Sequence, residues 1–360
     1  MKVGYARLYK DGTLVISKKR FIINPNIVKS YTIDSYGKNP WRKECKLIKK
    51  VKIESFIRTN NIAFWFEDCT NLTTLIDFQN LDVSECKDFF GLFLNCQSLI
   101  DIDSLKTWNV SNGKNFTSMF EYCKSLENIE ALRNWDVSNG TNFSDMFCNC
   151  ESLQDLNELQ NWNVSNGTDF SRMFFYCESL QNLNGLQTWN VSNGTDFSRM
   201  FRNCDSLQNI DALQTWNVSN GTDFSSMFNN CQSLQDLNAL QTWNVSNVTD
   251  FSYMFAVCTS LQNIDVLANW NVSNGTDFSG MFYNCESLQD INGLENWNVS
   301  NGTNFSYMFE FCESLQNILV SNTLSILRKE MFYKCNSTLK IHWKNHTYIY
   351  EDLLEYEKIC

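Results

Sequence analysis

The sequence predicts an α/β solenoid of about ten 27-residue turns, each with a short parallel strand and a short helix, behind a small β-rich N-terminal cap. Cysteine recurs every 27 residues from Cys69 to Cys312. Tryptophan keeps the same step from Trp108 to Trp297, and a Met-Phe pair keeps it from Met119 to Met308. One unit of this size cannot bury such side chains alone, so neighbouring turns must cover one another.

Length and composition exclude several classes of protein. The chain has 360 residues with only 2 Pro and 14 Gly, which excludes collagen-like and Pro/Gly-rich disordered chains. No apolar run approaches the roughly 18 residues of a membrane span, so we expect none. The start, Met1–Arg7, has no apolar stretch, so we expect no cleavable secretory signal. The net charge of -11 argues against nucleic acid as a partner.

The charge is unevenly distributed along the chain. Residues 1–53 hold 14 Lys/Arg and 3 Asp/Glu, whereas residues 54–318 hold 9 Lys/Arg and 32 Asp/Glu. We therefore predict a basic β-rich cap over 1–53, a repeat domain over 54–335 and a C-terminal cap over 336–360. The basic segment is either a solvated cap or a surface that attracts an acidic partner or a membrane.

Within one unit the pattern predicts two kinds of local structure. Residues 206–211, Ser-Leu-Gln-Asn-Ile-Asp, are short and loosely alternating, as a single strand should be. Residues 222–228 place Phe224, Met227 and Phe228 on one face of a helical turn. Asp223 or Ser225 can cap that turn. Residues 216–219 should form an extended connection.

The position after Ser-Asn tests the backbone geometry. It is Gly in most units but Val248 in one. A β-branched residue at positive φ is a serious outlier. The glycine is therefore not needed for a left-handed conformation, and we expect an extended residue with little packing demand.

The cysteines predict a ladder of buried free thiols. The chain has 15 Cys, and ten of them occupy one slot beside the Met-Phe pair. Bridging would have to join identical positions of neighbouring turns, which the geometry of a disulfide rarely allows. Bridged pairs and a metal site are the alternatives. Cys148 stands in a variable slot, which we expect to be exposed. Free thiols favour a reducing compartment.

The repeat resembles a known family. Its pattern W-x-V-S-N-x-T-x-F/M-S-x-M-F-x-x-C-x-S-L, for which 244–249 is the closest match, is similar to the leucine-rich repeats of BspA-like proteins. These repeats are common in mycoplasma lipoproteins and other bacterial surface proteins, and the similarity covers about residues 62–335. The resemblance implies a leucine-rich-repeat solenoid that is not an enzyme and serves adhesion or protein binding. It favours the cell surface, whereas the missing signal and the thiols favour the cytoplasm.

In a leucine-rich-repeat coil, the residues that flank the apolar position of the strand point outward on the inner, concave surface. Here these residues form a double row of short acids and amides, and we take them as the candidate binding site. The later turns contribute Asn182, Asn184, Asn209, Asp211, Asp236, Asn238, Asn263, Asp265, Asp290 and Asn292. From Asn209 onward acid and amide alternate in both rows, which avoids stacking like charges in adjacent strands.

Three interpretations of the rows remain open. They can be a solvated face with cross-strand amide–carboxylate hydrogen bonds, or a recognition surface for a basic protein or a glycan. A row of Ca²⁺ sites would need 6–8 oxygen ligands per ion, which each turn hardly offers.

Two further sets of positions vary between units. Asp169, Asp196, Asp223, Asp250 and Asp277 are replaced by Asn elsewhere, which favours capping over catalysis. Other variable pairs follow Met-Phe, and they can tune a partner or drift on an exposed convex face: Phe175-Tyr176, Arg202-Asn203, Asn229-Asn230, Ala256-Val257, Tyr283-Asn284 and Glu310-Phe311.

The ends of the chain predict closing elements. Residues 5–9 and 13–17 flank Asp11-Gly12, a strong hairpin signal. Residues 339–343 should form a last strand and 351–356 a short helix. His342 and His346, the only histidines, could pair on a metal, but no further ligand stands at metal-site spacing.

No catalytic motif is present, so we expect no enzyme, cofactor or resident metal. The leading hypothesis is a scaffold that binds a protein, for which a basic one is an option, or a glycan. A structural component that self-associates through the solenoid ends is the second hypothesis. A β-solenoid that binds or cleaves glycans is the third.

Overall fold

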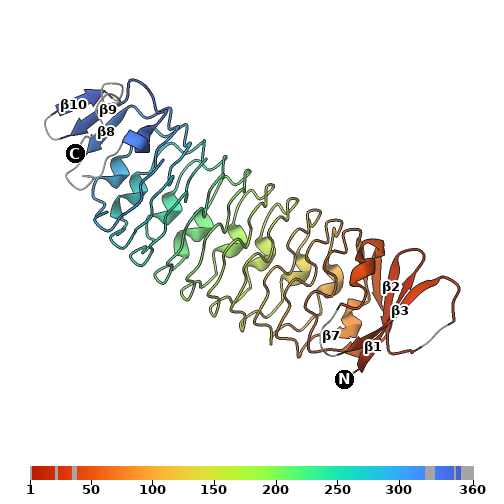
Figure 1. Cartoon of the computed structure of the whole chain (residues 1–360). Helices are drawn as coiled ribbons and strands as arrows, with labels where there is room; N and C mark the ends of the chain where they lie inside the picture. Colours follow the sequence, from red (N-terminus) through yellow and green to blue (C-terminus); the bar gives the residue numbers. More distant parts are fainter. Residues whose placement is uncertain (1, 21–22, 35–38, 321–328, 344–345, 350–360) are drawn as a thin grey trace. The chain divides into compact units, whose positions relative to one another are not determined.

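The structure, a computed structural model, describes residues 2–20, 23–34, 39–320, 329–343 and 346–349. The chain divides into two compact units, which are described separately. Unit 1 comprises Met1–Asp169 and Met173–Glu178, and unit 2 comprises Phe170–Arg172 and Ser179–Cys360. In each unit the chain winds into turns that lie side by side (Figure 1).

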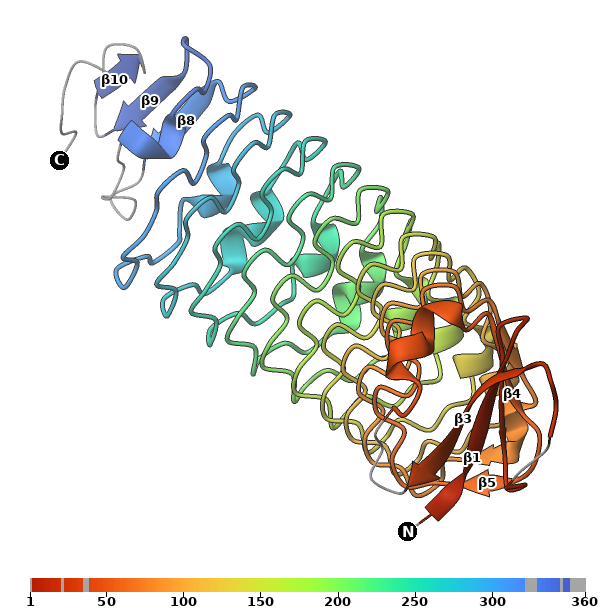
Figure 2. The ribbon, with the colours of Figure 1, turned by 45° about the vertical axis from the view of Figure 1, so that its right-hand side comes forward.

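Unit 1 begins with a five-stranded sheet in the order β3-β1-β2-β4-β6 (Figure 2). Its strands are β1 (Lys2–Tyr9), β2 (Thr13–Ser17), β3 (Ile27–Asp34), β4 (Lys50–Ile53) and β6 (Thr74–Ile76). β1 and β2 pair antiparallel around Gly12, whose φ is 86°, so the predicted hairpin is confirmed. The positive φ explains why glycine occupies this turn.

The same sheet leads from the hairpin into the repeats. β2 pairs with β4, and β4 with β6, in parallel. A second parallel pair joins β5 (Ile57–Arg58) to β7 (Leu81–Asp82). Each of these parallel partners is one turn further along the chain, so the stacking of turns begins inside the cap's own sheet.

Unit 2 ends in a three-stranded sheet in the order β10-β9-β8. Its strands are β8 (Asn317–Val320), β9 (Lys340–Trp343) and β10 (His346–Ile349). β9 matches the predicted last strand. The helix predicted over 351–356 lies outside the described residues. The pairing sets His342 opposite Thr347, and His342 Nδ1 lies 2.9 Å from Thr347 Oγ1.

Most repeats contain one short 3₁₀ helix, and its position differs from the prediction. It begins at the second candidate binding row, for example at Asp211 in η7 (Asp211–Thr215), and not at residues 222–228. The equivalent helices are η3 (Asp103–Leu105), η4 (Glu130–Leu132), η5 (Asn157–Leu159), η6 (Asn184–Leu186), η8 (Asn238–Leu240), η9 (Asp265–Asn269) and η10 (Asn292–Leu294). Further 3₁₀ helices lie at other positions: η1 (Arg42–Leu47), η2 (Phe78–Asn80) and η11 (Lys329–Phe332).

The segment predicted as a helix, 222–228, is a run of consecutive turns. The Met227 amide donates to Phe224 O within the turn (3.2 Å), whereas the Ser226 amide donates to Ser252 O of the next turn (2.7 Å). Ser226 has a φ of 55°, which a right-handed helix cannot contain. Hydrogen bonds between turns therefore override the helical pattern. The longer series of parallel bridges between turns runs through this segment and not through the strand predicted over 206–211.

At the glycine after Ser-Asn, the expectation about φ is confirmed and the expectation of little packing demand is wrong. Gly194 does not have a positive φ, as predicted. However, a Cβ atom added at Gly194 would lie 2.4 Å from Cζ of Phe197, so packing excludes a side chain there. In the turn before Val248, the Phe224 ring lies at 89° to Phe197, whereas equivalent rings elsewhere are nearly parallel.

The interior of each unit consists of columns of like side chains. In unit 1, Phe93, Phe120 and Phe147 stack with centroids 5.7 and 5.6 Å apart. In unit 2, Trp189, Trp216 and Trp243 stack at 6.4 and 6.5 Å. These rings are almost completely buried. Stacking of successive turns thus supplies the core that no single turn could form, which confirms the predicted solenoid.

Candidate functional site

Internal polar ladders satisfy the buried polar groups that the columns create. The Trp243 indole donates to Leu213 O of the preceding turn (3.0 Å), and other tryptophans repeat this bond. The Asn220 side-chain amide donates to Ser192 O of the preceding turn (2.7 Å). These hydrogen bonds between turns explain why Trp and Asn recur every 27 residues.

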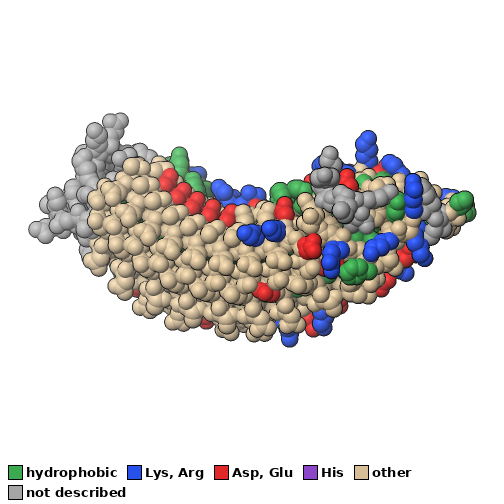
Figure 3. Space-filling view, turned by 90° about the horizontal axis from the view of Figure 1, so that it is seen from below, with side chains coloured by type: hydrophobic (Ala, Val, Ile, Leu, Met, Phe, Trp, Pro, Cys, Tyr) green, Lys and Arg blue, Asp and Glu red, His purple; other side chains and the backbone are tan. Residues whose placement is uncertain are grey.

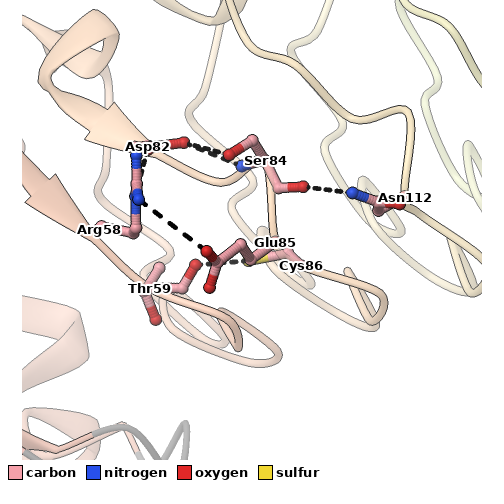
Figure 4. Close-up of polar contacts among 7 residues, drawn as sticks. All are labelled: Arg58, Thr59, Asp82, Ser84, Glu85, Cys86 and Asn112. Carbon is pink, nitrogen blue, oxygen red and sulfur yellow. Dashed lines mark hydrogen bonds and ion pairs between the residues drawn. The ribbon is translucent and has the colours of Figure 1, made fainter.

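The asparagine ladder begins beside the first turns of unit 1 (Figure 4). The Asn112 amide donates to Ser84 O (2.7 Å), and Ser84 donates through its amide and hydroxyl to Asp82 (3.1 and 2.7 Å). Arg58 pairs with the same carboxylate at 2.6 Å. Burial raises the pKa of Asp82, but the bonds from Ser84 and Arg58 outweigh it and hold the pKa below its ordinary value.

The cysteine ladder is buried and unbridged in the described residues, as predicted. The Cys231 thiol donates to Phe201 O of the preceding turn (3.2 Å). Burial raises the pKa of Cys258 to about 12. A thiol that stays protonated is neither a nucleophile nor a metal ligand. The column is therefore structural.

Cys148 corrects one expectation, because it is 1% exposed and not on the surface. Its slot lies between two left-handed residues, Asp145 and Asn149, and the turn they form directs the side chain inward. Glu121, Asp145 and Cys148 place three ligand-type atoms within 4.8 Å of one another. Burial, and then the two carboxylates, raise the pKa of the Cys148 thiol, so the thiolate that a metal needs is disfavoured.

The candidate binding rows are on the surface, but the side chains of the first row also accept hydrogen bonds from backbone amides two residues further on. Asn209 Oδ1 accepts a hydrogen bond from the Asp211 amide (2.7 Å), and the Asn209 side-chain amide donates to Asp211 Oδ2 (2.9 Å). The first row thus closes the start of the 3₁₀ helix, and the amide–carboxylate bond forms within one turn instead of between turns. Asn182 and Asp290 are half-buried, whereas these are exposed: Asn184, Asn209, Asp211, Asp236, Asn238, Asn263, Asp265 and Asn292.

The predicted stacking of the rows is seen between Asn182 and Asn209, which form a parallel bridge. A longer series of parallel β-bridges joins the aspartates that directly precede the Phe of each Thr-Asp-Phe-Ser segment. In unit 2 it joins Asp196, Asp223, Asp250 and Asp277, which therefore lie directly above one another. Asp223 Oδ1 accepts from the Ser225 amide (2.8 Å), so the predicted capping role holds, although the cap closes a turn and not a helix.

The variable positions beside Met-Phe form a third surface, which we call the slot surface. It comprises the residue before Met and the two residues before Cys in each turn. Left-handed φ values recur at the first and third of these, for example at Tyr253 (54°) and Asn284 (55°). Sequence analysis missed this conformation, although the frequent Asn at the third position was a signal for it. In Figure 3 most of the visible face is tan, which marks the backbone and uncharged polar side chains, and charged and hydrophobic side chains gather mainly along one edge.

Comparison with known proteins identifies the family. A model described as "Mycoplasma protein of unknown function, DUF285" matches residues 60–182, 127–238, 152–263 and 235–343. The chain belongs to this family. No curated protein matches the sequence. In the described residues, no helix has the length and apolar character needed to cross a bilayer.

Several solved leucine-rich-repeat structures resemble the chain at low identity. A leucine-rich cell surface protein of Faecalibacterium prausnitzii is 18% identical with a TM-score of 0.41, over 88% of this chain and 94% of that one. A Bacteroides ovatus protein is 16% identical (TM-score 0.35; 96% and 99% covered). A Eubacterium ventriosum protein is 14% identical (TM-score 0.36; 97% and 99% covered). Because these TM-scores are low, the leucine-rich-repeat fold of this DUF285 chain is inferred from its own stacked turns and not from these similarities.

Proposed function

We propose that this DUF285 protein is a non-enzymatic scaffold that binds a protein partner through the exposed polar surface of its repeats. The observation that carries the proposal is the separation of two sets of side chains. Repeated columns hold the turns together, whereas acids such as Asp211 and Asp265 stand exposed and take no part in that framework beyond their own turn. The BspA-like resemblance and a role in adhesion belong to this proposal.

The charge of the repeats favours a basic partner. Residues 54–318 hold 32 Asp/Glu and only 9 Lys/Arg. A surface of one sign speeds the encounter with a partner of the opposite sign and disfavours others. The later turns of the binding rows contribute three exposed carboxylates, Asp211, Asp236 and Asp265, in successive turns.

The first prediction concerns the double substitution Asp211→Asn and Asp265→Asn. It removes two charges but preserves the shape and keeps both helix starts intact, because the caps are Asn209 and Asn263. We expect proteins captured by the wild-type chain from a cell lysate to be depleted at least severalfold, with unchanged thermal unfolding. Quantitative mass spectrometry of the captured proteins measures the effect.

The matched control is Asp101→Asn with Asp103→Asn, which makes the same charge change in the equivalent rows of unit 1. Capture by this control should resemble that of the wild type. If the unit 2 variant captures the same proteins as the control, the rows are not the binding surface. If the wild-type chain captures no protein above background, the scaffold proposal itself is wrong.

Self-association is a second candidate, and the edge of the first sheet favours it. β3 stands at the end of the strand order, and Val28 on it is 53% exposed. An exposed edge can pair with another strand. Light scattering after size exclusion should give the mass of one chain if the scaffold proposal holds. A concentration-dependent multiple that Val28→Lys abolishes would favour assembly.

A further inference from the structure

The five-stranded sheet of unit 1 has one edge at which lysine and aliphatic side chains gather. β1 and β2 meet there in the hairpin, β3 begins on one side of it, and β4 begins on the other. Backbone hydrogen bonds join these segments: the Lys10 amide donates to Asn26 O (2.9 Å), and the Lys49 amide donates to Gly12 O (2.8 Å). We call this site the hairpin edge, and its members are Lys10, Ile23, Lys46, Leu47, Lys49 and Lys50.

The four lysines of the hairpin edge are exposed and have no carboxylate partner. In the described part of the chain, no acidic side chain lies within ion-pair distance of any of them. The acids nearby serve other contacts. Glu44 pairs with Lys29 and accepts a hydrogen bond from the Tyr31 hydroxyl. Asp11 accepts one from the Thr13 amide (3.0 Å). The positive charge of the edge therefore stays uncompensated within the fold.

Two aliphatic side chains stand among these lysines. Ile23 is 103% exposed, so the protein shields almost none of its surface, and Leu47 is 55% exposed. Leu47 adjoins the hairpin, because a Cβ atom added at Gly12 would lie 2.7 Å from Leu47 O. Ile23 precedes Asn26 by three residues, which is at most about 10 Å of chain. Aliphatic surface of this size is unfavourable in water, and a ligand with an apolar region would cover it.

An anionic lipid surface accommodates both kinds of side chain. Its potential attracts lysines, with a gain in binding of about fivefold for each one near the surface. Aliphatic side chains enter the boundary between head groups and acyl chains, while the long lysine side chains keep their ammonium groups among the head groups. An acidic peptide would neutralise the lysines but would leave a fully exposed Ile23 in water.

The distribution of charge along the chain favours contact through the cap. Residues 1–53 hold 14 Lys/Arg and 3 Asp/Glu, whereas residues 54–318 hold 9 and 32. In Figure 3, Lys and Arg side chains lie around the right-hand end of the face, which belongs to unit 1, with hydrophobic side chains among them. An anionic surface therefore attracts the cap and repels the repeats.

We propose that the hairpin edge binds the surface of an anionic lipid membrane. The ammonium groups of its lysines contact the anionic head groups, and Ile23 and Leu47 enter the head-group boundary. The contact is peripheral and requires no segment that spans the bilayer. It goes beyond the proposed scaffold function, because it uses the cap of unit 1 and not the binding rows of unit 2.

The test is co-sedimentation of the full chain with vesicles of phosphatidylcholine that contain about 30% phosphatidylserine, and with vesicles of phosphatidylcholine alone. We expect binding to the anionic vesicles only, and a loss of binding as salt is raised to about 0.5 M. Lys46→Gln with Lys49→Gln should weaken binding about twenty-fivefold, the product of two fivefold losses. Ile23→Ser with Leu47→Ser should weaken it about tenfold, because their apolar surface no longer enters the lipid.

Matched controls remove the same kinds of side chain from the repeats of unit 1. Lys106→Gln with Lys114→Gln removes two exposed lysines, and Ile100→Ser removes an aliphatic side chain that is 52% exposed. Both controls should bind the anionic vesicles as tightly as the wild type. Thermal unfolding should be the same for all variants, because every substituted side chain is exposed.

Three outcomes would overturn the proposal. The first is that the wild-type chain does not sediment with the anionic vesicles at low salt. The second is equal binding by the hairpin-edge variants and their controls, which would place the contact elsewhere. The third is binding of soluble poly-glutamate in place of the vesicles, with a loss in the lysine variant, which would make the edge a docking site for an acidic protein. None of these results decides the proposed function, since capture through Asp211 and Asp265 is measured without lipid.

Discussion

The interiors of the two units are built alike, but the acidic columns on their surfaces differ. In unit 1 the column reads Asp88, Asn115, Asn142, Asp169, and the Asn115 amide donates to Asp88 (3.0 Å). In unit 2 it reads Asp from Asp196 to Asp277, and an amide follows only at Asn304.

The interiors of the two units show no such difference. The Phe columns stack at nearly the same spacing, 5.7 Å for Phe93–Phe120 and 5.6 Å for Phe201–Phe228. Trp162 and Trp243 each donate to the leucine carbonyl of the preceding turn. The comparison teaches that stacking fixes the interior in both units, whereas surface positions are free to differ in charge.

The largest expected effect is a loss of folding stability at high pH, which tests whether the interiors of the two units are equivalent. The thiols are protonated in the fold, and burial raises the pKa of Cys86 and Cys258 to about 12. Because the unfolded thiols ionise near 8.5, stability is fully present below that pH and is lost as pH rises toward the folded pKa values. Each buried thiol contributes a loss of about 1.4 kcal/mol per pH unit.

Guanidinium unfolding at pH 7.5, 8.5, 9.5 and 10, with a reductant present, measures this loss. Cys123→Ala in unit 1 and Cys258→Ala in unit 2 should each reduce the slope by about one thiol's share, 1.4 kcal/mol per pH unit. A midpoint that stays constant to pH 10, or a slope that changes in one variant alone, would break the equivalence of the interiors.

A smaller effect is expected for the tryptophan ladder. Trp162→Phe and Trp243→Phe each remove an indole donor and leave the carbonyl of Leu132 or Leu213 without it. Each carbonyl keeps the hydrogen bond from the backbone amide of Trp135 or Trp216, so the substitution removes one net hydrogen bond, about 0.5–1.5 kcal/mol, to which the lost ring volume adds. Urea unfolding should show similar losses in the two variants. A loss confined to one of them would show that the ladders are not equivalent.

The smallest expected effect is a change in stability from charge repulsion within the acidic column, which differs between the two units. Asp250→Asn relieves repulsion in the acidic column and keeps the acceptor for the Ser252 amide, so stability should rise by about 0.2–1 kcal/mol. Asn142→Asp introduces the opposite change in unit 1 and should lower stability by a similar amount. Both effects should shrink in 1 M salt. Equal and opposite shifts would confirm the comparison, whereas no shift in either variant would show that the column carries no repulsion.

Much of the framework could be predicted from the repeat alone. The period of 27 residues placed Trp, Phe and Cys in columns, and the structure confirms their burial. The hairpin at Gly12 was predicted from residue type and position. The candidate rows were correctly predicted to be mostly exposed, but the bond from Asn209 to Asp211 within one turn was not foreseen.

The sequence by itself determined which positions stack, because a repeated residue must meet its own copy in the next turn whatever the local conformation. Only the tertiary structure decided how each turn is shaped. The Ser226 amide bonds to the next turn and takes a left-handed φ, so the helical pattern at 222–228 gives way and the 3₁₀ helix forms at Asp211. The burial of Cys148 and the close contact of Gly194 with Phe197 likewise follow from the folded shape of the turn, which residue types alone do not encode.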